Sequence, residues 1–185
     1  MCDKLQLRLR LLQTRAVLPV SEWQKKSDSI CSHLTNSQLL TKAKTILAYF
    51  SFRNEPDLSP LFSDTTHRWG FPRCFDKNLS WHLWQPGDEL SKGAYGITEP
   101  LSNAPIIESS EVDLILVPCV ACDYKGYRLG YGGGYYDRML SQAQWQSIPT
   151  IGIVFEFAYL PELPIETWDK PLQNICTENK LVRAG

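Results

Sequence analysis

The run Asp113-Leu-Ile-Leu-Val-Pro118 is the stretch of the sequence that says most about the fold. It is short and almost wholly apolar, which is typical of a central strand covered on both faces of a parallel sheet. Five further apolar or alternating runs are expected to be strands: 45–52, 69–75, 80–84, 150–154 and 174–177. Helical patterns interleave with these runs. The sequence therefore predicts a layered α/β domain with a largely parallel sheet flanked by helices.

The first third of the chain is predicted to be helical. One face of the first helix carries three leucines at i, i+4 and i+7: Leu5, Leu9 and Leu12. Another face carries three basic residues: Lys4, Arg8 and Arg15. Taken alone, such a basic face is more typical of a solvated helix than of a ligand site. A second helix is expected to begin at Ser21, where Gln24 completes a capping box, and to run through Ile30 and Leu34.

The composition is that of an ordinary globular protein. Of the 185 residues, 43% are hydrophobic and 21% are charged, and the formal net charge of −1 argues against a nucleic-acid-binding protein. No apolar run is long enough to span a membrane, and the first residues lack the pattern of a signal peptide. We therefore expect one cytoplasmic, monomeric domain over residues 1–185, with its six cysteines reduced. Proline and glycine gather at 85–105 and 161–171, which we expect to be long functional loops.

A glycine-rich segment follows the central strand: Gly126-Tyr-Arg-Leu-Gly-Tyr-Gly-Gly-Gly-Tyr-Tyr-Asp-Arg138. A helix is expected to begin near Tyr135, and a glycine loop that leads into a helix offers free backbone N–H groups to a phosphate. Arg128 could add a bidentate contact to phosphate oxygens, and Asp137 could hold a metal ion. The alternative is a flexible turn whose two tyrosines belong to the core. The segment matches neither the P-loop nor the dinucleotide-binding pattern.

These thirteen residues resemble the signature of the 5-formyltetrahydrofolate cyclo-ligase family, also called methenyltetrahydrofolate synthetases. The resemblance continues over most of the chain, in the basic first helix and in four further segments: 51–55, 96–100, 113–123 and 168–169. Cys119 and Cys122 stand where the family usually has Gly and Phe, and segment 71–74 matches only loosely. The resemblance implies a layered fold of the NagB/RpiA/CoA-transferase type, with a helical N-terminal segment.

The resemblance also implies an activity. A member of this family converts 5-formyltetrahydrofolate to 5,10-methenyltetrahydrofolate and uses ATP and Mg²⁺, with ADP and phosphate as co-products. Phosphorylation of the formyl oxygen turns a poor leaving group into a good one, and folate N10 then closes the ring within the same molecule. Such a reaction needs positioning and electrostatic stabilisation of the transferring phosphoryl group, without a nucleophilic side chain.

Site residues are carried over from the resemblance. The expected ATP-binding residues are Lys4, Arg8, Arg128, Leu129, Gly130, Tyr131, Gly132, Gly133, Gly134, Tyr135 and Tyr136. The expected folate-binding residues are Phe50, Glu55, Tyr95, Tyr131, Gly132, Gly133, Gly134 and Tyr135. Lys4 and Arg128 are expected to be catalytic, and Asp137 and Asp169 to hold Mg²⁺. Phe50 and Tyr95 would sandwich the pterin ring, and Glu55 would accept hydrogen bonds from its donor edge.

Two other interpretations remain open at this point. The chain could be a nucleotide- or folate-binding module without turnover, although its loop glycines and Asp137 are intact. It could also be a sugar-phosphate isomerase or CoA-transferase-like enzyme, since such enzymes are expected to share the layered fold. Cys119 and Cys122 have the spacing of a metal or redox pair, but no second pair completes a zinc site. No histidine is given a catalytic role.

Overall fold

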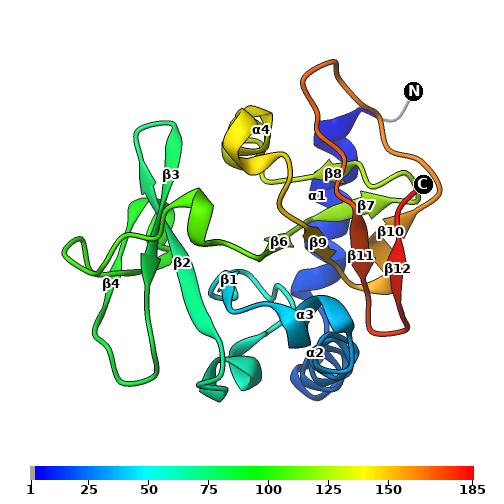
Figure 1. Ribbon diagram of the computed structural model, residues 1–185. Helices are drawn as coiled ribbons and strands as arrows, with labels where there is room; N and C mark the ends of the chain where they lie inside the picture. The colour runs from blue at the N-terminus through cyan, green and yellow to red at the C-terminus, as the bar shows by residue number, and fades with distance from the viewer. Residues whose placement is uncertain (1–2) are drawn as a thin grey trace.

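A seven-stranded sheet runs through the computed structural model, which describes residues 3–185 (Figure 1). Its strands are β1 (Thr45–Leu47), β2 (Arg68–Phe75), β3 (Asn78–Leu83), β6 (Leu114–Pro118), β9 (Thr150–Ile153), β11 (Asn174–Cys176) and β12 (Leu181–Arg183). Two smaller sheets contain β4 (Leu90–Lys92) with β5 (Thr98–Pro100), and β7 (Ala121–Asp123) with β8 (Arg128–Leu129) and β10 (Tyr159–Leu160). The α-helices are α1 (Lys4–Ala16), α2 (Val20–Thr35), α3 (Gln38–Lys42) and α4 (Tyr135–Ser141). Short 3-10 helices lie at Ser59–Ser63, Ala94–Gly96, Ser109–Glu111, Ala143–Trp145 and Glu156–Ala158.

The large sheet is parallel at its centre and antiparallel at its edges. Its order is β12-β11-β9-β6-β1-β2-β3, and only the two edge strands, β12 and β3, run antiparallel to their neighbours. The apolar run of β6 lies in the middle, and residues 114–117 are fully buried. This arrangement confirms the predicted α/β fold with a largely parallel sheet, and a strand lies in each of the six runs expected to form one.

The two faces of the sheet are buried against different helices. Side chains of a strand alternate between faces, so Leu114 and Leu116 of β6 join one core cluster while Ile115 and Val117 join the other. The first cluster includes residues of α2 and α3, and the second includes residues of α1 and α4. The predicted flanking of the sheet by helices is therefore confirmed.

The buried face of α1 differs from the expected one. Leu5 and Leu9 are 54% and 52% exposed, whereas Leu7 and Leu11 are buried together with Arg15. Both leucine sets recur every four residues, so periodicity alone could not choose between them. The buried set is the one that brings the Arg15 guanidinium into the interior, where its Nε donates to the main-chain oxygen of Arg53 at 3.0 Å.

The start of α2 also differs from the expected one. The helix begins at Val20 and its N-cap is Pro19, with no side-chain capping bond, so Ser21 lies inside the first turn and forms no capping box. Pro19 disfavours helical geometry at Leu18, so the helix does not extend further toward the N-terminus, and it begins at the residue after the proline. The predicted burial of Ile30 and Leu34 is confirmed, since both are fully buried.

Two segments, 45–52 and 85–105, contain more than the one kind of structure expected of each. The strand expected over 45–52 ends at Leu47, because β2 pairs with β1 only as far as Gly70 and then continues along β3. The chain turns after Phe50 through Arg53 and Asn54, whose φ angles are 50° and 57°. The expected loop 85–105 contains the β4–β5 hairpin, whereas 161–171 has no helix or strand.

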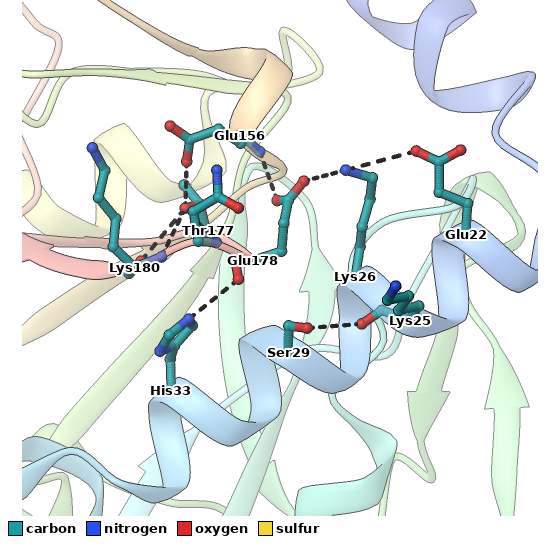
Figure 2. A network of polar contacts seen from close by, with 10 residues as sticks. Glu22, Lys25, Lys26, Ser29, His33, Glu156, Thr177, Glu178 and Lys180 are labelled. Atoms are coloured by element: carbon teal, nitrogen blue, oxygen red, sulfur yellow. Dashed lines mark hydrogen bonds and ion pairs between the residues drawn. The ribbon is translucent and has the colours of Figure 1, made fainter.

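The C-terminal hairpin β11–β12 is attached to α2 by a polar network (Figure 2). Lys26 Nζ lies 2.5 Å from one carboxylate oxygen of Glu178, and the main-chain N–H of Glu156 donates to the other at 2.7 Å. Thr177 Oγ1 donates to the Glu156 carboxylate at 2.5 Å. The side chain of Glu178 is only 8% exposed. This network joins α2, segment 156–158 and the final hairpin, so it ties the last strands to the sheet's helical layer.

The structure bears on two further expectations, the absence of a membrane-spanning helix and the reduced state of the cysteines. Within residues 3–185, no helix is long and apolar enough to cross a membrane. The cysteines of this range are all free thiols, as expected; Cys2 lies outside the described residues.

Candidate active site

A cavity of about 720 Å³ lies beyond the carboxyl ends of β1 and β6. Ligands of parallel α/β sheets bind at this edge, because the loops that leave the strands meet there. The cavity is lined by α1, segment 49–55, the β2–β3 hairpin, Pro118 at the end of β6, the β4–β5 hairpin, the glycine loop 128–137 and segment 166–169. Every site residue predicted from the sequence is among the lining residues. The cavity therefore brings the residues predicted to bind ATP and those predicted to bind folate into one space.

The glycine loop is held open by its backbone conformation. Gly132 and Gly134 have φ angles of 103° and 66°, in the left-handed region that favours glycine. The N–H groups of residues 131–134 donate to no acceptor within residues 3–185. Because α4 has only seven residues, any anion at this loop would be bound mainly by these N–H groups, and the helix dipole would add little. The expected start of a helix at Tyr135 is confirmed.

Arg8 lies against this loop. Its Nε donates to the main-chain oxygen of Gly130 at 2.7 Å, which fixes the guanidinium in place. A Cβ built on Gly132 would stand 3.8 to 4.0 Å from the guanidinium carbon and its two terminal nitrogens. Those two nitrogens have no other partner within residues 3–185. An anion held by the loop N–H groups would therefore meet a pre-positioned guanidinium fork.

Arg128 and Asp137 form an ion pair at the base of the cavity. Arg128 Nη2 donates to Asp137 Oδ1 at 2.7 Å, and Arg128 Nη1 donates to the main-chain oxygen of Lys170 at 2.7 Å. The Arg128 side chain is only 4% exposed, while that of Asp137 is 27% exposed. Each terminal nitrogen of Arg128 thus makes one hydrogen bond within the protein, and the guanidinium bridges α4 and segment 166–170. Its expected contact with phosphate stays a prediction. Asp137, for which the sequence suggested no structural role, has one.

Lys4 and Asp169 pair with each other. Lys4 Nζ lies 2.6 Å from Asp169 Oδ2, and the same oxygen accepts the main-chain N–H of Glu166 at 2.8 Å. The side chains are 24% and 10% exposed. The residues assigned to phosphate and to metal therefore neutralise each other when no ligand is bound. Figure 1 shows the orange segment that contains Asp169 passing beside the blue N-terminal end of α1.

Glu55 is a buried carboxylate at the opposite end of α1. It is 3% exposed, and one oxygen accepts the main-chain N–H of Phe52 at 3.0 Å. Burial raises the pKa of Glu55 to about 7, against the lowering effects of the Arg15 charge, the Phe52 N–H and the Tyr131 hydroxyl. Arg15 Nη2 also donates to the Tyr131 hydroxyl. A group of three side chains thus links α1, segment 49–55 and the glycine loop.

The two aromatic residues expected to enclose the pterin, Phe50 and Tyr95, differ in exposure and packing. Phe50 is stacked on Phe71, with ring centroids 4.1 Å apart, and only part of its surface faces the cavity. Tyr95 is 73% exposed and sits on the hairpin with a φ of 63°. A side-chain hydrogen bond with Tyr95, together with burial, raises the pKa of Tyr135 to about 12. Phe50 therefore forms part of a fixed wall, whereas Tyr95 and Tyr135 form the rim.

Several lining residues were not among the predicted site residues. The most buried is Glu99, which is 1% exposed, accepts the main-chain N–H of Cys74 at 2.9 Å and lies 3.6 Å from Arg73 Nη1. It fixes the hairpin that carries Tyr95 onto β2. The remaining ones include Phe52, Arg53, Glu166 and Trp168. Arg15 does not line the cavity, but it contacts the lining residue Tyr131 and its charge acts on Glu55; the sequence placed it on the same basic helix face as Lys4 and Arg8.

Other candidate chemistry is not supported. Cys119 and Cys122 are both buried, and burial together with Cys119 raises the pKa of Cys122 well above its ordinary value. Within residues 3–185, no group of three or more His, Cys, Asp or Glu side chains is arranged to hold a metal ion by itself. Any metal at this site would therefore need ligands from a substrate.

Comparison with known proteins agrees with the geometry. The model of the 5-formyltetrahydrofolate cyclo-ligase family matches residues 1–178. A 5-formyltetrahydrofolate cyclo-ligase from Haemophilus influenzae is 32% identical over 177 residues, which are 92% of this chain and 95% of that protein. The Escherichia coli protein of the same name is 29% identical, over 91% of this chain and 97% of its own. The solved 5,10-methenyltetrahydrofolate synthetase of Aquifex aeolicus superposes with a TM-score of 0.86 at 32% identity, covering 97% of this chain and 92% of that one. The chain belongs to the 5-formyltetrahydrofolate cyclo-ligase family.

Proposed function

We propose that this protein uses ATP to convert 5-formyltetrahydrofolate to 5,10-methenyltetrahydrofolate, with release of ADP and phosphate. The observation that carries the proposal is a single cavity, in a member of this family, that joins an open glycine loop and Arg8 to the buried carboxylate of Glu55. The first part is suited to a polyphosphate and the second to a heterocycle with several N–H donors. A reaction between the two substrates requires that both kinds of subsite share one space.

The chemistry proceeds in two steps. The formyl oxygen attacks the γ-phosphorus of ATP, the bond to the β-phosphate oxygen breaks, and ADP leaves. Folate N10 then attacks the activated formyl carbon, loses its proton, and the phosphate departs with the former formyl oxygen. Because N10 belongs to the same molecule as the formyl group, ring closure needs only the correct conformer. The protein contributes position and electrostatic stabilisation.

The phosphate subsite consists of the loop N–H groups, Arg8 and Lys4. Arg8 faces the loop with two free nitrogens, and it can follow the charge that develops on the transferred phosphoryl oxygens. Lys4 is held by Asp169 before ATP arrives and would be shared with the phosphates afterwards. Arg128 supports this subsite, because its hydrogen bonds keep Asp137 and segment 166–170 in place.

Mg²⁺ fits this site through Asp137. One oxygen of Asp137 pairs with Arg128, and the carboxylate still lies at the cavity surface, which suits the usual Mg²⁺ site of one or two carboxylates completed by substrate phosphates and water. Asp169 would hold the ion only if Lys4 released it. When bound, Mg²⁺ neutralises charge on the β- and γ-phosphates. We also propose that the enzyme is monomeric and cytoplasmic, as the sequence led us to expect.

The folate subsite consists of Glu55, Tyr131 and the aromatic walls. An ionised Glu55 can accept two hydrogen bonds from the amino and ring N–H groups of the pterin. In the free protein Phe52 N–H and the Tyr131 hydroxyl occupy part of that carboxylate. Phe50 offers one wall and Tyr95 a rim on the β4–β5 hairpin.

One assay tests the proposal. Purified protein is mixed with ATP, Mg²⁺ and 5-formyltetrahydrofolate, and the absorbance of the methenyl product is followed beside release of ADP. We expect both products in equal amounts, and neither when ATP is omitted or a chelator is added. ADP release without methenyl product would indicate a simple ATPase, and binding of both ligands without turnover would indicate a binding module; either result would overturn the proposal.

A further inference from the structure

Trp168 stands apart from the other tryptophans of residues 3–185. Its side chain is 64% exposed and lines the cavity, whereas the others are buried or half-buried. It makes no ring contact, and its indole N–H donates to no acceptor within the described chain. A scattered exposed aromatic needs no explanation. One that lines a binding cavity and stacks on no other ring of the described chain is able to hold a planar ligand.

The turn that carries Trp168 is held by two hydrogen bonds and an ion pair. The N–H of Glu166 donates to Asp169 Oδ2 at 2.8 Å, and the N–H of Asp169 donates to the main-chain oxygen of Glu166 at 3.1 Å. Lys4 Nζ, at 2.6 Å from the same carboxylate oxygen, attaches this turn to the first turn of α1. These contacts hold the backbone of the turn beside the N-terminal end of that helix, so binding on Trp168 would have less loop entropy to remove.

Helix α1 gives the order of the subsites along the cavity. Arg15 lies beside Glu55 at the folate end, Arg8 contacts the glycine loop, and Lys4 contacts the turn of Trp168. At a rise of 1.5 Å per residue, about 10 Å separates the first two positions along the helix axis and about 6 Å the last two. The phosphates thus lie between the pterin and Trp168. The γ-phosphate must face the formyl group, so the rest of the nucleotide extends away from it, toward Lys4.

We propose that Trp168 is the platform on which the nucleobase of ATP stacks. This inference rests on the proposed function, because it takes the glycine loop as the phosphate subsite. Stacking on an indole uses the π-face that every purine has, so it distinguishes a nucleotide from a bare polyphosphate more strongly than it distinguishes ATP from GTP. Trp168 is accordingly a binding residue for the nucleobase, and it takes no part in the phosphoryl transfer itself.

Steady-state kinetics on three variants test the assignment. Trp168→Ala should raise the KM for ATP roughly tenfold, with kcat at saturating ATP and the KM for folate unchanged. Trp168→Phe should restore most of the affinity, since a phenyl ring still stacks. Ile165→Ala is the matched control, because Ile165 is 51% exposed on the same loop and does not line the cavity. An unchanged KM for ATP in Trp168→Ala, or a raised KM for folate instead, would overturn the assignment.

A binding measurement separates this inference from the proposed function. The indole fluorescence of the wild-type protein, minus that of Trp168→Phe, should be quenched when ADP is titrated without folate. Inorganic tripolyphosphate, which has no base, should leave it unquenched. Quenching by ADP in a protein that forms no methenyl product would support the platform while the proposed function fails. Methenyl formation without any quenching would support the function and refute the platform.

Discussion

Replacing Glu55 by glutamine should remove a pH dependence that the wild-type enzyme has. Burial raises the pKa of this carboxyl to about 7 in the free protein. Only the ionised form can accept hydrogen bonds from two pterin donors, so kcat/KM for folate should follow its ionisation. With that pKa, roughly nine-tenths of the molecules are ionised at pH 8 and roughly one-tenth at pH 6, which predicts about a tenfold fall. The KM for ATP should change little over the same range.

The same substitution should raise the stability of the free protein. The folded pKa of about 7 lies above the ordinary value of 4.5. A raised carboxyl pKa contributes stability below the unfolded value, and this contribution is lost as the pH rises through about 7. At pH 8 the wild-type protein therefore carries a buried charge that costs up to about 3 kcal/mol, which the neutral glutamine does not carry. Glu55→Gln should unfold at a higher temperature than wild type at pH 8, and the difference should vanish near pH 4.

The assay is a pair of profiles: initial rates from ADP release between pH 5.5 and 8.5 at limiting folate, and thermal unfolding across the same buffers. Glu55→Gln should show a low, flat kcat/KM for folate and a raised melting temperature above pH 7. Tyr131→Phe is a useful companion, because it removes a hydroxyl that stabilises the charged carboxyl and should shift the wild-type profile to higher pH. A glutamine variant with the wild-type pH profile, or one less stable at pH 8, would refute the reasoning.

Three further substitutions test other parts of the site and the fold. Arg8→Ala should lower kcat/KM for ATP about 10- to 150-fold, because it removes a charge-assisted contact, and should leave the melting temperature unchanged. Arg10→Ala is the control, since Arg10 is exposed on the same helix. Equal kcat/KM values in the two variants would show that Arg8 does not contact ATP. Asp137→Asn should lose most turnover and regain part of it when the Mg²⁺ concentration is raised. A loss of turnover that added Mg²⁺ does not relieve would show that Asp137 only pairs with Arg128 and does not hold the metal ion. Lys26→Met should lower the free energy of unfolding by about 1–2 kcal/mol and the melting temperature by roughly 2–8 °C, because it leaves the nearly buried Glu178 carboxylate without its ion pair. Lys25→Met, which removes a lysine that forms no ion pair, should melt like wild type. An equal fall in melting temperature in both variants would exclude the ion pair as the cause.

The sequence alone predicted the structural elements that depend on residues close together in the chain. The apolar run of β6 identified a strand covered on both faces, and the glycines of 130–134 identified an open loop, since both depend on residue type within a few positions. The thirteen-residue signature carried the family, and every residue that it suggested for the site lines the cavity. Errors arose where two local patterns were equally good, as in α1, whose alternative leucine faces have the same period.

Only the tertiary structure decided the partners of the charged residues. Lys4 and Asp169 are separated by 165 positions and Arg15 and Tyr131 by 116, and no local pattern relates members of such pairs. Their pairing follows from how α1 packs across the ends of the strands, which depends on the complete core. The same packing buries the carboxyl of Glu55, which raises its pKa to about 7, and it lets the Arg128 guanidinium bridge Asp137 and the main-chain oxygen of Lys170. Residue types determine which charges a chain carries, but desolvation and distance determine what those charges do, and both exist only after folding.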